Sequence, residues 1–316
     1  MRLQAKSATL FIAIGLALYA ALFYAADRLV YRTGKSNPLY KIAVAEPTHF
    51  DWVILDASHA MPLDFADFNG FMEKETGLHI VNLASPGSGP LYNRFVFEQF
   101  LTKHRTRNLL YIVDSFAFYH VTWNEERFTD AKLLGRTPFD AAIASRLLSY
   151  CLNEGVDFRA LLDYVTGFSK INNRARFERD IWEGEKQFGR VFRPSPAMTK
   201  SRISYLYPKL PTPAGLARYL EVFDGLVALA QQQGVHVLVI KVPVPPDFRG
   251  QIPNESEFDA ALSGLLARRQ IAFLDLSAEL PEPRFYFDTD HLNRAGVTEL
   301  FEKHLKTILL ATSVRQ

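Results

Sequence analysis

The chain has 316 residues, of which 48% are hydrophobic and 22% charged, with 17 glycines and 17 prolines. This composition indicates a folded protein, because it is too apolar for a disordered chain and lacks the period of collagen or a coiled coil. The 36 Lys and Arg against 34 Asp and Glu give a net charge of +2, which argues against nucleic acid as the main partner. A single cysteine, Cys151, excludes an internal disulfide framework and a cysteine-based zinc cluster.

The first strong pattern is a run of 19 uncharged, mostly apolar residues from Ala8 to Ala26. As a helix rising about 1.5 Å per residue, this run is roughly 28 Å long, close to the thickness of a bilayer's hydrocarbon core. A cleaved signal peptide is the competing interpretation, but the run is longer than the apolar region of such a peptide, and its possible exits lack a small residue at position −3. We therefore expect an uncleaved signal anchor over residues 1–32, followed by a juxtamembrane stalk over residues 33–49.

Beyond the stalk, short apolar runs alternate with amphipathic segments. Strands are predicted at residues 53–55, 80–83, 109–113, 236–242 and 271–276, and helices at 64–75, 90–103, 212–233, 254–269 and 294–310. The third of these helices has signals at both ends, because Thr212-Pro213 opens it and Gly234 follows it. Strands that alternate with helices predict an α/β fold with a mainly parallel sheet covered on both faces. Ligands bind such sheets at the carboxyl ends of the strands.

Residues 121–210 do not fit this alternation. They contain helical stretches at 141–151 and 158–168 and an arginine-rich middle at 174–202, with 15 Lys and Arg against 11 Asp and Glu. We interpret the whole interval as a helical insertion after the third strand. Its basic excess could face an anionic glycan or lipid headgroups, although a solvated helical face is the simpler explanation.

Polar residues follow three of the predicted strands and precede the last helix. They form the blocks Asp56-Ala57-Ser58-His59, Ser85-Pro86-Gly87-Ser88-Gly89, Asp114-Ser115 and Asp288-Thr289-Asp290-His291. A serine at a sharp turn between a strand and a helix exposes its hydroxyl near backbone N–H groups that favour an oxyanion. A histidine can take the hydroxyl proton, and a carboxylate can hold that imidazole in the required tautomer. Asp288 and His291 lie three residues apart, so the carboxylate and the imidazole can meet within one short loop.

In their order, these blocks resemble the SGNH (GDSL-type) hydrolase superfamily over roughly residues 50–312, with the insertion outside it. The resemblance implies a flavodoxin-like three-layer sandwich within a domain over residues 50–316. It further implies Ser58 as nucleophile, His291 as general base and Asp288 as its orienting carboxylate. The amides of Ser58 and Gly87 are then the expected oxyanion donors.

The chain departs from the family's pattern in two blocks. Asp56-Ala57-Ser58-His59 stands where Gly-Asp-Ser is typical, and Asp114-Ser115 stands where the family has an asparagine. An ionised Asp114 cannot donate a hydrogen bond to an oxyanion. We expect Asp114, Ser115 and His59 to border the substrate cleft.

A membrane anchor ahead of such a domain looks most like the D-alanyl transfer proteins of teichoic-acid modification and the alginate O-acetylation proteins. This resemblance implies an extracytoplasmic, periplasmic domain held at the cytoplasmic membrane. Such a domain takes an acyl group passed on by a membrane-bound O-acyltransferase and places it on an envelope or exported polysaccharide. No cofactor or metal is expected. The rival hypothesis is a catalytically weak scaffold or binding subunit of a polysaccharide-modification complex.

Structural alternatives exist for the site residues. Ser58 could cap the segment that follows it, a role that serine often fills. Asp290 could replace Asp288 as the partner of His291. His59 and the residues of the last block could in principle ligate a metal, although no second spaced histidine pair supports this.

Overall fold

The computed structural model describes residues 2–313, which form two compact units. The first unit combines the residues up to Ala43 with Phe128–Asp180. The second unit combines Val44–Arg127 with the residues from Ile181 onward. The chain therefore leaves the second unit once, to build most of the first, and then returns to it.

The second unit contains a parallel five-stranded sheet in the order β2-β1-β3-β4-β5. This is the strand order of flavodoxin-like doubly wound sheets. Every strand predicted from the apolar runs is present, and the α/β class is confirmed. The strands are β1 (His49–Leu55), β2 (Ile80–Asn82), β3 (Arg105–Ile112), β4 (His236–Lys241) and β5 (Ala272–Asp275).

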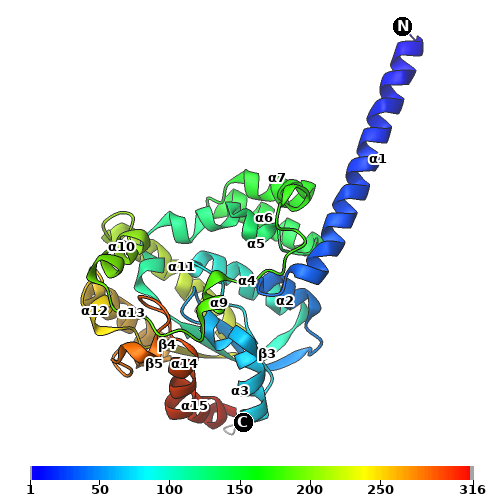
Figure 1. The fold of residues 1–316 in the computed structure, drawn as a ribbon. Helices are drawn as coiled ribbons and strands as arrows, with labels where there is room; N and C mark the ends of the chain where they lie inside the picture. Colours follow the sequence, from blue (N-terminus) through cyan, green and yellow to red (C-terminus); the bar gives the residue numbers. More distant parts are fainter. Residues whose placement is uncertain (1, 314–316) are drawn as a thin grey trace. The chain divides into compact units, whose positions relative to one another are not determined.

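Helices cover both faces of this sheet (Figure 1). On one face, Trp52, Ile54 and Ile112 join a buried apolar cluster with residues of the C-terminal helices. On the other, the ring of Tyr111 packs on Phe223 with ring centroids 4.7 Å apart. The two faces alternate along each strand because successive side chains point to opposite sides. The helices of this unit are α3 (Phe68–Thr76), α4 (Pro90–Lys103), α9 (Glu183–Gln187), α10 (Pro196–Leu206), α11 (Pro213–Gln232), α12 (Pro246–Arg249), α13 (Glu255–Arg269), α14 (Arg294–Leu300) and α15 (Lys306–Ser313).

Local signals account for several helix boundaries. The Thr212 hydroxyl accepts a hydrogen bond from the Gly215 amide at 3.1 Å and caps α11, as its sequence predicted. Gly234, just beyond the end of α11, has a φ of +71°, which glycine adopts without strain. The helix expected at 294–310 is interrupted by a π turn at Phe301–Leu305.

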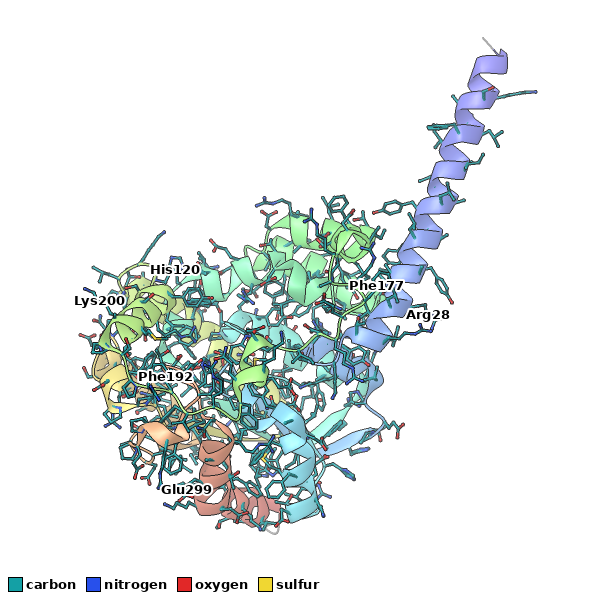
Figure 2. The ribbon with its side chains drawn as sticks, in the orientation of Figure 1. Arg28, His120, Phe177, Phe192, Lys200 and Glu299 are labelled. Carbon is teal, nitrogen blue, oxygen red and sulfur yellow. The ribbon has the colours of Figure 1, made fainter. Side chains whose placement is uncertain are left out.

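The first unit is helical and begins with α1 (Arg2–Thr33). Within residues 2–313, the stretch Lys6–Thr33 is the one helix long and apolar enough to cross a membrane. The side chains of residues 6–22 of α1 are exposed (Figure 2), whereas Ala26, Val30 and Thr33, spaced like one helix face, are buried. The other helices of this unit are α2 (Pro38–Val44), α5 (Ala131–Leu134), α6 (Ala141–Asn153), α7 (Phe158–Thr166) and α8 (Phe168–Asn172).

Two boundaries differ from the sequence prediction. The segment predicted as a stalk contains α2, whose Leu39 and Ile42 are buried. The interval predicted as a single insertion is divided, because residues 128–180 pack with α1 whereas residues 181–210 return to the sheet unit. Hydrogen bonds tie residues 128–180 to the end of α1. The Asp180 amide donates to the Thr33 carbonyl at 2.6 Å. The Arg136 guanidinium also donates to the Thr33 hydroxyl, at 2.9 Å.

Candidate active site

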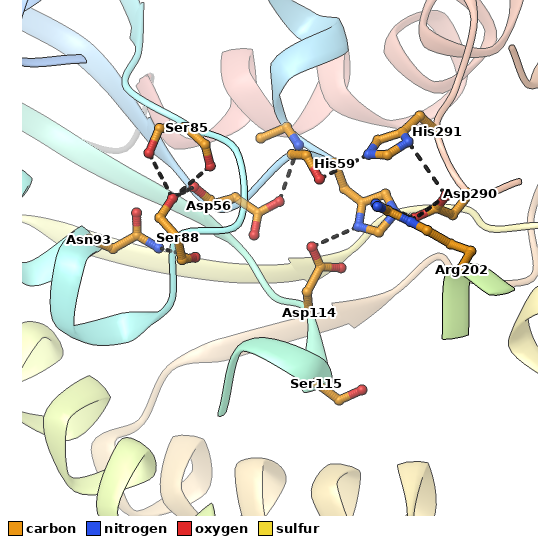
Figure 3. A network of polar contacts seen from close by, with 12 residues as sticks. Asp56, His59, Ser85, Ser88, Asn93, Asp114, Ser115, Arg202, Asp290 and His291 are labelled. Atoms are coloured by element: carbon orange, nitrogen blue, oxygen red, sulfur yellow. Dashed lines mark hydrogen bonds and ion pairs between the residues drawn. The ribbon is translucent and has the colours of Figure 1, made fainter. Parts of the chain in front are cut away.

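The candidate site lies at the carboxyl ends of β1, β2 and β3, where the sequence placed it (Figure 3). Ser58 follows β1, Ser85 follows β2, and Asp114 follows β3. The loop Asp288–Asn293 leads into α14. These ends meet at one edge because parallel strands all run in the same direction.

The structure brings Ser58, His291 and Asp288 together. The Ser58 hydroxyl lies 2.9 Å from Nε2 of His291, and Nδ1 of His291 lies 2.9 Å from Oδ2 of Asp288. Because an ionised Asp288 can only accept, the imidazole donates from Nδ1 to this carboxylate, and in its neutral form Nε2 is the nitrogen that can accept a hydrogen bond from Ser58. The same carboxylate accepts the backbone amides of Asp290 at 3.1 Å and His291 at 2.8 Å, so the loop itself holds it in place.

This geometry decides two of the alternatives. Ser58 does not cap the turn that follows it, because the short helix Met61–Leu63 is preceded by Ala60 and the serine hydroxyl points to His291. Asp290 is also not the nearest carboxylate to the His291 imidazole. Its oxygen lies 3.5 Å from Nδ1, against 2.9 Å for Asp288.

Aromatic rings fix the plane of the His291 imidazole. The ring of Phe287 is parallel to it, with an angle of 6° and centroids 5.6 Å apart. The ring of Trp182 meets it edge-on at 5.1 Å. Ser58 and His291 are both buried, at 4% and 1% exposure, so the contact between their side chains is shielded from bulk water. Trp182 was missed by sequence reasoning because it lies in the segment interpreted as part of the insertion.

A second chain of charged groups runs beside the triad. The His59 imidazole lies 2.7 Å from Asp114 through Nδ1 and 3.3 Å from Asp290 through Nε2. Nε of Arg202, on α10, donates to both carboxylate oxygens of Asp290, at 3.1 and 2.9 Å. No spacing in the sequence links Arg202 to this site, because α10 lies almost 90 residues away from Asp290 along the chain.

Burial and the alternation of charge in this chain shift its pKa values. Burial alone would lower the pKa of His59, but the carboxylates of Asp114 and Asp290 outweigh it and raise that pKa well above its usual value. Burial opposes ionisation of Asp290, yet His291, Arg202 and His59 together bring its pKa well below the usual value. We therefore describe His59 as an imidazolium held between two carboxylates.

Asp56 behaves differently from these carboxylates. It is fully buried, and burial together with the nearby charge of Asp114 raises its pKa well above the usual value. One of its oxygens accepts the Ala60 amide at 3.1 Å, which holds the turn that presents Ser58. Asp56 is thus a structural acid at the base of the site.

The loop after β2 is fastened to the end of β1. The Ser88 hydroxyl lies 2.9 Å from that of Ser85 and donates to the Asp56 carbonyl at 3.1 Å. Gly87 has a φ of +61°, and an added Cβ would lie 2.8 Å from the Trp123 ring, so only glycine fits there. In the described part of the chain, the amides of Ser58 and Gly87 donate no hydrogen bond. Both expected oxyanion donors are therefore free to bind an incoming group.

Asp114 and Ser115 border a cavity of about 340 Å³, as His59 does. Asp114 points to His59 and Ser115 to the Tyr207 hydroxyl, which lies 2.8 Å from its Oγ. The polar wall also contains Lys241, whose ammonium pairs with Glu255 at 2.5 Å. Burial would lower the pKa of Lys241, but Glu255 and Asp259 outweigh it and raise that pKa. Apolar side chains line the same cavity, among them Val242, Val244, Phe248 and Ile252.

His59, Asp290 and His291 lie close enough together to be considered as ligands of a metal ion. Acceptor atoms of His59, Asp290 and His291 lie within 4.8 Å of one another. However, the Arg202 guanidinium occupies both oxygens of Asp290, and Ser58 occupies Nε2 of His291. A metal ion bound to Asp290 would lie next to the positive charge of the guanidinium. These residues therefore fit a buried chain of ion pairs better than a metal centre.

No model of a known protein family and no curated protein sequence matches this chain. The likeness to SGNH hydrolases therefore rests on the chain's own residues, namely the order of its blocks and their position after β1, β2 and β3. The functional proposal below starts from the geometry of those residues.

Proposed function

We propose that this protein is a membrane-anchored serine acyltransferase or esterase of the SGNH type. The observation that carries the proposal is the continuous hydrogen-bonded line from Ser58 through His291 to Asp288, with both links at 2.9 Å. A parallel sheet in the order 2-1-3-4-5, with this line at the carboxyl ends of its strands, supports it. By the resemblance, the catalytic unit faces the extracytoplasmic side of the membrane.

The reaction would proceed through an acyl-serine. Nε2 of His291 takes the proton of Ser58 as Oγ bonds to the carbonyl carbon of the acyl donor. The free amides of Ser58 and Gly87 are the groups available to stabilise the resulting oxyanion. The bond to the leaving oxygen or sulfur then breaks, and the leaving group takes the proton from His291. An acceptor hydroxyl then gives its proton to Nε2 of His291 as its oxygen bonds to the acyl carbon. The bond from that carbon to Oγ of Ser58 breaks, and Oγ takes the proton from His291, which restores both side chains.

The surroundings favour transfer to a sugar over hydrolysis. Ser58 and His291 are shielded from water, and exclusion of water protects an acyl-enzyme from hydrolysis. The adjacent cavity is lined by polar side chains such as Ser115 and Glu255 and by apolar ones such as Phe248. A sugar ring presents hydroxyls and an apolar face, so the cavity suits a polysaccharide acceptor. A membrane-bound O-acyltransferase would supply the acyl group.

The test is covalent labelling of the detergent-solubilised protein with a fluorophosphonate. Labelling should disappear in Ser58→Ala and fall strongly in His291→Ala. The matched control is Ser115→Ala, which removes a buried serine that borders the cavity but does not touch His291. Unchanged labelling of Ser58→Ala would remove Ser58 from the mechanism.

A scaffold without turnover remains the second candidate, and one observation favours it. Asp114, in place of the family's asparagine, is paired with His59 and offers no hydrogen-bond donor to an oxyanion. A folded wild-type protein that neither labels nor hydrolyses an activated acetyl ester, alone or with its acyltransferase partner, would support this candidate.

A further inference from the structure

The first unit exposes an apolar surface on α6, α7 and α8. Phe158, Leu162 and Val165 recur at the spacing of one helix face and are all exposed, while Ala160 and Tyr164 of α7 are buried on another. Leu162 is 61% exposed. We name this surface the α7 face, formed by Leu148, Leu152, Phe158, Leu162, Val165 and Phe168. Because α6 and α8 both pack against α7, these side chains lie on neighbouring helices, and exposed apolar side chains gathered in this way are typical of a site of interaction.

The α7 face begins where α1 contacts the rest of its unit. The Tyr19 hydroxyl donates to the Thr166 carbonyl at 3.1 Å, at the end of α7. Phe23 packs edge-on against Phe139, with centroids 5.6 Å apart. Phe23 also lies so close to Gly167 that an added Cβ would come within 2.4 Å of its ring. Both Tyr19 and Phe23 belong to the uncharged run Ala8–Ala26.

The length of α1 places these contacts at the level of the membrane. If the bilayer ended before Tyr19, the 11 residues Ala8–Leu18 would remain inside it, a helix of about 16 Å that cannot cross a core of about 30 Å. A spanning α1 must therefore keep Tyr19 and Phe23 in the membrane. The helix rises about 10 Å from Tyr19 to Ala26, so the end of α7 lies inside the boundary of the apolar layer.

Charges mark where the chain leaves that layer. Asp27, the first charged residue after the run, pairs with buried Lys170 at 2.6 Å. The sequence of this unit, residues 1–43 and 128–180, has 14 Lys and Arg against eight Asp and Glu. Exposed Arg28, Arg174 and Arg179 are among them, and Phe177 is 71% exposed (Figure 2). Basic residues beside exposed apolar ones are typical of surfaces that bind anionic lipid headgroups.

We infer that the α7 face is seated in the interface of the bilayer that α1 crosses, in a leaflet with anionic phospholipid. The helices that contact the end of α1 thus hold the first unit against the surface of the membrane. This inference rests on α1 crossing the membrane and is independent of the chemistry at Ser58.

The experiment uses the full-length protein in vesicles of phosphatidylcholine and phosphatidylglycerol. A fluorescent probe is attached to Leu162→Cys or Phe168→Cys in a Cys151→Ser background, and lipids with a shallow nitroxide quench it. The matched control is Lys35→Cys, an exposed position of the same unit beyond the end of α1. Quenching should be severalfold stronger at positions 162 and 168 than at 35, and should weaken when phosphatidylglycerol is omitted.

Equal quenching at all three positions, or equal access of a water-soluble quencher, would overturn the inference and leave a protein partner as the occupant. A protein that does not float with the vesicles would overturn it too, because the seating requires an inserted α1. Crosslinking of the unmodified protein by a photoactivatable lipid tests the same point, with labels expected in residues 158–177. A Ser58→Ala variant should behave like the wild type in every arm, which separates this inference from the proposed function.

Discussion

Two neighbouring carboxylates, Asp288 and Asp290, allow the triad to be separated experimentally from the buried ion-pair chain. Both lie near His291, but the side chain of Asp288 is 32% exposed and that of Asp290 is fully buried. Asparagine at either position keeps the shape of the side chain and removes its charge. We expect Asp288→Asn to lose activity with little loss of stability, and Asp290→Asn to lose stability.

The magnitude for Asp290→Asn follows from its partners. The fully buried carboxylate faces the partly buried Arg202 guanidinium at 2.9 Å and the buried His59 imidazolium at 3.3 Å, and without it Asp114 would be the carboxylate left to His59. Breaking a buried pair in this way costs about 3–5 kcal/mol. For a unit of about 220 residues, at about 2–4 °C per kcal/mol, the melting temperature should fall by about 6–20 °C.

For Asp288→Asn, the Oδ1 atom can still accept the two loop amides, so the fold should hold. An NH2 group then takes the place of Oδ2 at 2.9 Å from Nδ1, so the imidazole loses the carboxylate charge that fixes its tautomer. The same change in a serine-protease triad lowers kcat by about 10⁴-fold. The assays are thermal unfolding by near-UV circular dichroism and hydrolysis of an activated acetyl ester. Unchanged melting of Asp290→Asn would refute a stabilising role of the ion-pair chain, and full activity of Asp288→Asn would refute the triad.

Three further predictions concern stability. The pKa of His59 in the folded protein lies above the value of about 6.5 in the unfolded chain. The contribution of this imidazolium to the stability of the fold is therefore complete below pH 6.5 and is lost as the pH rises through the pKa of the folded state. Melting temperatures between pH 6 and 9 should therefore fall more steeply in the wild type than in His59→Gln, and parallel profiles would contradict this. The pKa of Asp56 is also raised on folding, so at pH 8 the wild-type protein must take up a proton as it folds, which Asp56→Asn does not need. The melting temperature of the variant at pH 8 should therefore be higher than that of the wild type. A lower melting temperature would show that the Asp56 carboxylate is ionised in the folded protein. Gly167→Ala should destabilise the first unit, measured by its rate of tryptic cleavage, because its φ of +68° is strained for alanine and the added methyl meets Phe23. Gly77→Ala, in the second unit, with a φ of +70° and open space around it, is the control for backbone strain alone. An equal rise in the cleavage rate of its own unit would exclude a contribution from the Phe23 contact.

Much of the sheet unit could be predicted from the sequence because its signals are local. An apolar run of strand length, a capping threonine or a glycine after a helix depends on a few neighbouring residues. The same holds for Asp288 and His291, which meet within one loop. Ser58 could be added to them because parallel strands end at one edge, and that rule needs only the order of the strands.

Other features depend on residues that meet only in the folded chain. Nothing near Trp182 or Arg202 in the sequence indicates that they contact His291 and Asp290. The division of residues 121–210 between the two units was likewise invisible, because α7 and α8 are amphipathic segments whose partner is α1, more than 130 residues away. The protonated state of His59 follows from two carboxylates on different loops.

The sequence by itself therefore determined the fold class, the apolar helix and the three residues of the candidate triad. Tertiary packing decided which side chains surround that triad and which surface lies against α1. The physical reason is that hydrophobic periodicity indicates which face of a helix is buried, but not which other segment of the chain packs against that face. A pKa likewise depends on the charges and the solvent around a group in three dimensions, not on its neighbours along the chain.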